Sequence, residues 1–148
     1  METKELPIEV ARISLLNKVV FAWKLLTDMR VYDGQIMMLD KRLELDTRAE
    51  SYRMLIANYL VALVGQGKND RISLYNKPIE SKKQQIEKFY ADNAADIKKL
   101  TKIRDKIYAH FDTDCTSTID IIPFGLIKNL IDNLVTILDY KAPVLPRA

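Results

Sequence analysis

Apolar residues recur every three or four positions along most of the chain, which is the spacing of one face of an α-helix. In residues 8–29 they form one long stripe. A second helix is predicted from residue 47 to 64, and in residues 54–64 apolar side chains nearly surround it, which is typical of the central helix of a bundle. Gly65 and Gly67 predict its end. A last stripe follows Pro123. The pattern therefore predicts long helices, and no run of alternating residues makes a persuasive pair of strands.

Two short patterns predict where helices begin. Thr47 is followed three residues later by Glu50, and Ser81 is followed in the same way by Gln84. This spacing is the capping box, in which two side chains satisfy free N–H groups at a helix start. Residues 35–45 fit either a helical extension or a packed connection between helices.

The number of helices after residue 80 stays open between two readings. A helix over 81–90 either continues through Asp92-Asn93 or restarts there and runs over 94–111. The chain is expected to be a single all-α domain over 1–148, a bundle of four or five helices. Residues 142–148, with two prolines, are expected to form a flexible tail.

Composition bears on the compartment. One cysteine cannot form an internal disulfide, which favours a reducing, cytoplasmic location. Charged residues occupy the first few positions and no apolar segment follows them directly, so no signal peptide is expected. The most apolar run, residues 54–65, is too short for a bilayer, which needs about 20 residues. We therefore expect no membrane association.

The net charge of +3 is unevenly distributed. Residues 66–106 carry eleven basic and six acidic side chains, whereas residues 1–65 are balanced and the rest is slightly acidic. A basic segment favours a phosphate-bearing partner. The alternative is a solvated, lysine-rich helix face that binds nothing.

Residues 103–112 concentrate the potential chemistry of the chain and contain its one histidine, His110. Arg104 precedes it by six residues, so the two side chains point about 120° apart on an ideal helix. They converge only at a distorted helix end or through a second copy of the motif in a dimer. The structural alternative is a packed His110, with Arg104 paired to Asp96 or Asp105.

The heptapeptide RDKIYAH at residues 104–110 resembles the signature of the HEPN superfamily, an Arg, a polar residue and a His a few positions later. The sequence of residues 103–112 resembles in particular the abortive-infection and toxin–antitoxin branch of this superfamily. This resemblance implies an up-and-down bundle of four or five helices. It also implies a homodimeric, metal-independent endoribonuclease that cleaves RNA by attack of the ribose 2′-OH, in phage defence or a toxin–antitoxin system.

The resemblance also implies roles for single residues. His110 would be the general acid/base, Arg104 would bind the phosphate, and Asp105 would orient a partner group. RNA contacts are expected from Lys102, Lys106 and Tyr108. No cofactor is implied, and a nucleotidyltransferase-type antitoxin is one partner that the resemblance suggests. The alternative function is a catalytically inactive helical module that binds nucleotide, RNA or protein.

Other kinds of site have little support in the sequence. A metal centre needs clustered His or Cys ligands, and the chain has one of each. Asp112, Asp114 and Asp120 are best read as an acidic loop. Residues 65–67 lack the spacing of a phosphate-binding loop, and Cys115 has no fixed activating neighbour except His110.

Overall fold

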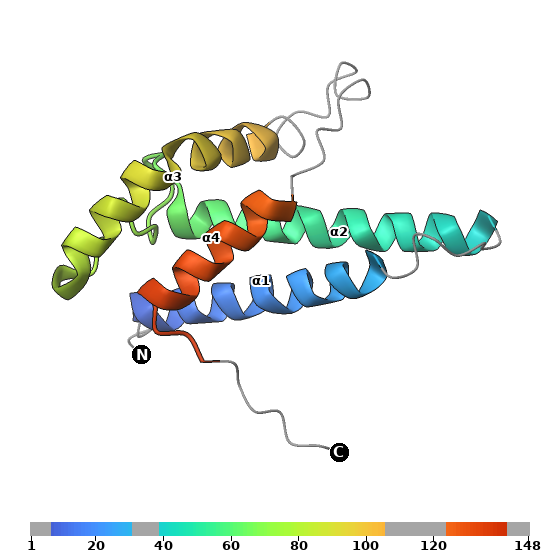
Figure 1. The fold of residues 1–148 in the computed structure, drawn as a ribbon, viewed down its shortest axis with the longest axis horizontal. Coiled ribbons are helices and arrows are strands. Elements are labelled where there is room, and N and C mark those ends of the chain that lie inside the picture. Colours follow the sequence, from blue (N-terminus) through green and yellow to red (C-terminus); the bar gives the residue numbers. More distant parts are fainter. Residues whose placement is uncertain (1–6, 31–38, 106–123, 142–148) are drawn as a thin grey trace, which may run out of the picture.

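The computed structural model describes residues 7–30, 39–105 and 124–141, and within them every long element is helical (Figure 1). The elements are α1 (Ile8–Arg30), α2 (Leu39–Val64), the short 3₁₀ helix η1 (Glu80–Lys82), α3 (Lys83–Arg104) and α4 (Phe124–Ile137). The described residues contain no strand. The all-α prediction is thus confirmed, and the described ranges hold four α-helices. The HEPN-like up-and-down arrangement stays a prediction.

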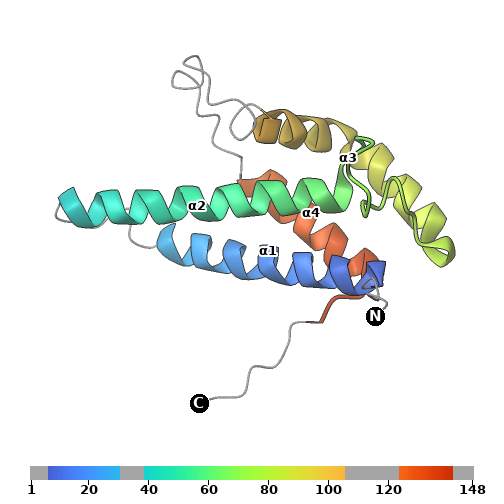
Figure 2. The same ribbon diagram turned by 180° about the vertical axis from the view of Figure 1, so that it is seen from behind.

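Helices α1 and α2 lie side by side and antiparallel, and α4 crosses them, as both ribbon views show (Figures 1 and 2). Helix α3 packs against α2 and α4. Buried apolar side chains from all four helices form one core; the largest that are fully buried are Leu16, Leu26, Ile56, Leu60, Leu63, Ile97, Leu100, Ile127, Leu130 and Leu134. Their spacing is the one that predicted the helices.

The predicted helix starts are wrong in two places. Helix α2 begins at Leu39, so Thr47 lies inside it, where its carbonyl accepts from the Ser51 hydroxyl at 3.0 Å. Glu44 and Arg48 lie one helical turn apart and form an ion pair of 2.9 Å across the position where the helix was expected to start. Ser81 lies in η1, and α3 begins after it without a side-chain cap.

Helix α3 runs without a break through Asp92-Asn93, so the continuous reading is confirmed. Asn93 is buried at 6% exposure, and its amide donates to the Phe89 carbonyl at 2.8 Å. Asn129 of α4 donates to Oδ1 of Asn93 at 2.6 Å. Asn93 therefore ties α3 to α4 instead of ending the helix.

Helix α4 ends in a hydrogen-bonded stop. Asp139 has a positive φ of 50°, and the Tyr140 N–H bonds back to the Val135 carbonyl at 3.0 Å, the pattern of a Schellman motif. The ammonium of Lys82 contacts the Ile137 carbonyl and lies 2.7 Å from the Asp139 carboxylate. A cation at a helix C-terminus is stabilising because it faces the negative end of the helix dipole.

None of the described helices combines the length and the apolar character that crossing a membrane requires.

Candidate functional site

Arg104 is the last residue of α3 and points toward the inner side of that helix. It follows the fully buried Leu100 by four residues, and residues four apart share a helix face. Its side chain is 27% exposed. Lys102 is exposed. Two residues turn an ideal helix by about 200°, so Lys102 lies on nearly the opposite side of α3 from Arg104. The structure therefore separates the side chains of Lys102 and Arg104.

Two carboxylates face the guanidinium of Arg104. Its Nε and Nη2 donate to Oδ1 of the adjacent Asp105 at 3.0 and 2.9 Å. Its Nη1 lies 3.6 Å from Oδ1 of Asp70, which is an ion pair but too long for a hydrogen bond. The pairing with Asp105 is the one that the structural reading of the sequence anticipated. Asp70 was not anticipated.

The Asp70 side chain is only 12% exposed although it belongs to the loop between α2 and α3. Its Oδ2 accepts from the Gly67 N–H at 3.0 Å. A methyl group on Gly65 would overlap that same oxygen, so the carboxylate occupies space that only a glycine leaves free. The two glycines that predicted the end of the second helix therefore also seat the Asp70 carboxylate.

The loop that carries Asp70 is braced from inside itself and from α1. The Asn76 amide donates to the carbonyls of Gly67 and Asp70 at 2.8 and 2.9 Å. Arg12 of α1, at 1% exposure, donates to the carbonyls of residues 72, 73 and 77. Burial lowers the pKa of the Arg12 guanidinium, and the negative charge of Glu9 opposes that shift. Such bonds fix a loop that is otherwise free to move.

Tyr90 of α3 closes the other side of this loop. Its hydroxyl donates to the Val64 carbonyl, the last of α2, at 2.8 Å. Its ring meets the rings of Tyr75 in the loop and of Phe89 edge to face. Burial raises the pKa of the Tyr90 phenol, so it stays a neutral hydrogen-bond donor.

Part of the predicted site falls outside the described residues. Lys106, Tyr108 and His110 are in this part, together with the alternative candidates Asp112, Asp114, Cys115 and Asp120. Among the described residues, Arg104 and Asp105 are brought together, and Asp70 joins them. The sequence analysis missed Asp70 because it lies 34 positions from Arg104. The nearby glycines, Gly65 and Gly67, were the one sequence signal that could have indicated a closely packed side chain in this loop.

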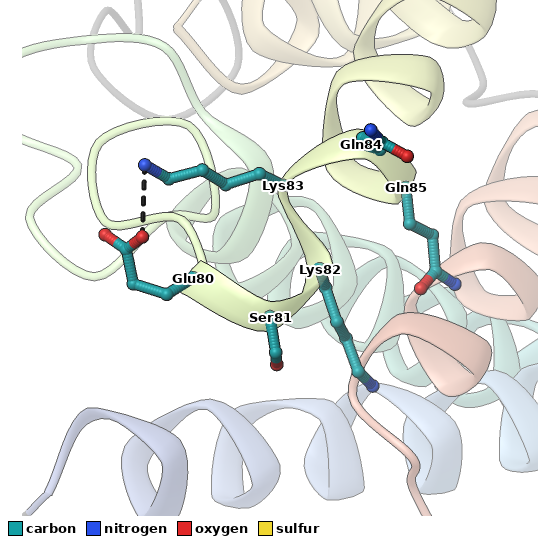
Figure 3. A pocket seen from close by; sticks show the side chains of 6 residues that line it. All are labelled: Glu80, Ser81, Lys82, Lys83, Gln84 and Gln85. Atoms are coloured by element: carbon teal, nitrogen blue, oxygen red, sulfur yellow. Dashed lines mark ion pairs between the residues drawn. The ribbon is translucent and has the colours of Figure 1, made fainter.

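A surface hollow at the start of α3 is lined by Glu80, Ser81, Lys82, Lys83, Gln84 and Gln85 (Figure 3). Its cations are already paired: Lys83 with Glu80 at 3.1 Å, and Lys82 with Asp139 at 2.7 Å. It therefore offers no free charge to a ligand. Within the described ranges no three His, Cys, Asp or Glu side chains are grouped as metal ligands would be.

Comparison of the chain with protein-family models, with curated proteins and with solved structures gives no match in any of the three. The family reading consequently rests on the motif at residues 104–110 alone.

Proposed function

We propose that this chain is a HEPN-type, metal-independent endoribonuclease that acts as a cytoplasmic homodimer in phage defence or a toxin–antitoxin system. The observation that supports it is the setting of Arg104. Two carboxylates orient its guanidinium, which remains partly exposed at the end of α3. An oriented guanidinium suits phosphate binding through two parallel N–H bonds.

In the proposed reaction the ribose 2′-hydroxyl attacks the adjacent phosphorus and the bond to the 5′-oxygen breaks. His110 is the general acid/base, a role that suits histidine because an imidazole ordinarily changes charge near neutral pH. Arg104 binds the phosphate and stabilises the charge that develops on it. One product ends in a 2′,3′-cyclic phosphate, and the other ends in a 5′-hydroxyl after its oxygen takes up a proton. Because Arg104 and His110 do not share a helix face, a homodimer would supply two motif copies to one groove.

The exposed lysines of α3 support an RNA substrate. Lys98 and Lys102 are four residues apart and share one face, with Lys88 and Lys99 exposed on the same helix. Basic side chains of this kind bind the phosphate backbone without reading its sequence. The lysine face and Arg104 lie on different sides of α3, so an RNA strand that touches both must pass around the end of this helix.

The test is cleavage of single-stranded RNA in the presence of a chelator. We expect the wild type to cleave, leaving cyclic phosphate ends. His110→Ala should lower the rate by about 10²- to 10⁴-fold, the usual contribution of a general acid/base. Gln84→Ala, at an exposed and uncharged site in the first turn of α3, is the matched control for protein handling. Unchanged cleavage by His110→Ala contradicts the assignment, and a monomer in solution contradicts the dimer.

The second candidate is a catalytically inactive helical module that binds nucleotide, RNA or a protein such as a nucleotidyltransferase-type antitoxin. The observation that favours it is the same pair of carboxylates, because structural ion pairs have this arrangement too. It predicts that Arg104→Ala and His110→Ala weaken dimerisation or thermal stability while no RNA is cut by any variant. Sedimentation and thermal melting beside the cleavage assay separate the two candidates.

A further inference from the structure

The loop between α2 and α3 holds one carboxylate in place. Oδ2 of Asp70 is fixed by the Gly67 N–H, and its backbone carbonyl is fixed by the Asn76 amide. The Ser73 N–H bonds to the same carbonyl at 3.2 Å. The Asp70 side chain is mostly buried, so the surrounding protein atoms restrict where its carboxylate can lie. What remains unbound by the loop is Oδ1, and this atom faces Arg104.

The guanidinium of Arg104 is approached from two sides. Asp105 takes Nε and Nη2, and Asp70 lies against Nη1. A guanidinium has five N–H donors. The two hydrogen bonds to Asp105 use the Nε–H and one N–H of Nη2, whereas Asp70 meets Nη1 as an ion pair without a hydrogen bond. The second N–H of Nη2 and the N–H groups of Nη1 therefore have no hydrogen-bond acceptor among the described residues. Nη1 and Nη2 form the outer end of a guanidinium, and one N–H from each, here called the outer N–H pair, can meet two oxygens of a phosphate.

We propose that Asp70 is a positioning residue for Arg104, which it aims so that its outer N–H pair meets an RNA phosphate. This inference rests on the proposed function and adds to it a residue far from the motif in sequence. Asp105 alone does not fix the guanidinium, because it is 54% exposed and lies on the same helix end. Asp70 supplies a second, independent point of attachment from a braced loop.

Asp70→Asn is the most informative substitution. The side chain keeps its size, and its oxygen can still accept from the Gly67 N–H. The amide NH₂ then faces Arg104, where two donors repel. The loop thus keeps its internal bond while the contact with Arg104 is lost. Asp92→Asn, at an exposed carboxylate on α3, is the matched control for the loss of one negative charge.

The first readout is cleavage in a double-mutant cycle. Asp70→Asn should lower kcat/KM about tenfold in the wild-type background and leave it unchanged in an Arg104→Ala background, because a positioning residue has nothing left to position. Asp92→Asn should change neither. Equal losses from Asp70→Asn in both backgrounds, or no loss in the wild type, would overturn the inference and leave the proposed function standing.

The second readout does not need cleavage. The Nε–H signal of Arg104 in a ¹⁵N NMR spectrum, assigned by its disappearance in Arg104→Lys, is followed during titration with an RNA strand whose 2′-hydroxyls are replaced by hydrogen. We expect the signal to shift with this strand in the wild type and in Asp92→Asn, and to shift much less in Asp70→Asn. If the wild type cleaves no RNA, the proposed function fails, and this titration decides the inference: equal shifts in all three proteins overturn it.

Discussion

The hydroxyl of Tyr140 donates a hydrogen bond of 2.6 Å to Oδ1 of Asn17, joining the segment after α4 to α1 across 123 positions. Tyr140→Phe keeps the ring and removes this bond. We expect the free energy of unfolding to fall by about 0.5–1.5 kcal/mol, the usual net value of a hydrogen bond. Urea denaturation followed by circular dichroism measures it. Tyr75→Phe, at an exposed ring, should change stability by less than about 0.5 kcal/mol.

Arg12 is expected to be the most stabilising charged residue of α1. Arg12→Met keeps most of the side-chain volume but leaves three loop carbonyls without their donor. We expect a loss of about 3 kcal/mol, because unsatisfied buried groups are costly. Lys24→Met, at an exposed cation on the same helix, is the control and should be nearly neutral. Thermal melting of the two variants side by side checks the difference; equal melting temperatures would contradict it.

Glycine-to-alanine substitutions at two positions should have opposite effects. A methyl group on Gly65 would overlap Asp70 and lie 2.5 Å from the Val61 carbonyl oxygen, so Gly65→Ala should cost about 1–3 kcal/mol. A methyl group on Gly125 of α4 would meet nothing within 4 Å. Gly125→Ala should therefore leave stability unchanged or raise it by up to about 1 kcal/mol. Chemical denaturation of both variants gives the comparison, and a stabilising Gly65→Ala would contradict the close packing described.

Tyr90 should make the protein sensitive to alkaline pH. Burial raises the pKa of its phenol above the value of 10.0 in the unfolded chain. The contribution of Tyr90 is therefore fully present below about pH 10, and it is lost as the pH rises through the folded-state pKa. In Tyr90→Phe the lost bond to Val64 should lower stability at neutral pH by about 1 kcal/mol.

The difference in the free energy of unfolding between the wild type and Tyr90→Phe separates the ionisation of Tyr90 from that of the other tyrosines, which both proteins share. We expect the difference to shrink between pH 9 and pH 11 because only the wild type has the buried phenol to ionise. Urea midpoints measured across that range at constant ionic strength would show it. A difference that stays constant with pH would mean that Tyr90 titrates alike in the folded and unfolded chain.

The periodic apolar pattern predicted the end of α1 and, together with Gly65 and Gly67, the end of α2. It also predicted helices where the structure has α1, α2, α3 and α4, but it left open whether α3 was one helix or two. It failed where local signals competed with the continuity of a helix. Thr47 and Ser81 resemble caps in isolation, yet α2 passes through the first and η1 contains the second. A capping pattern shows that a sequence favours the start of a helix at that position. Good helix formers that precede the pattern can nevertheless extend the helix toward the N-terminus, so that the pattern lies inside it.

The candidate site was only partly predictable for a different reason. Arg104 and Asp105 are adjacent in sequence, so their pairing follows from the backbone alone. Asp70 reaches Arg104 through the path of a loop, which depends on where Arg12 and Asn76 bind that loop. Such contacts arise from the assembled fold, and no spacing rule encodes them. His110 lies outside the described residues, and its role stays a prediction.

The bonds from Arg12 to the loop join residues 60 to 65 positions apart, and they have a consequence for the order of folding. Bringing Arg12 and the loop together closes this long segment and costs conformational entropy, which must be offset by other contacts. The loop is thus expected to lock only after α1 has docked along α2, late in assembly. Arg104 would then meet Asp70 only in the completed bundle. On the proposed function, a partly folded chain would not yet hold this guanidinium in place for an RNA phosphate.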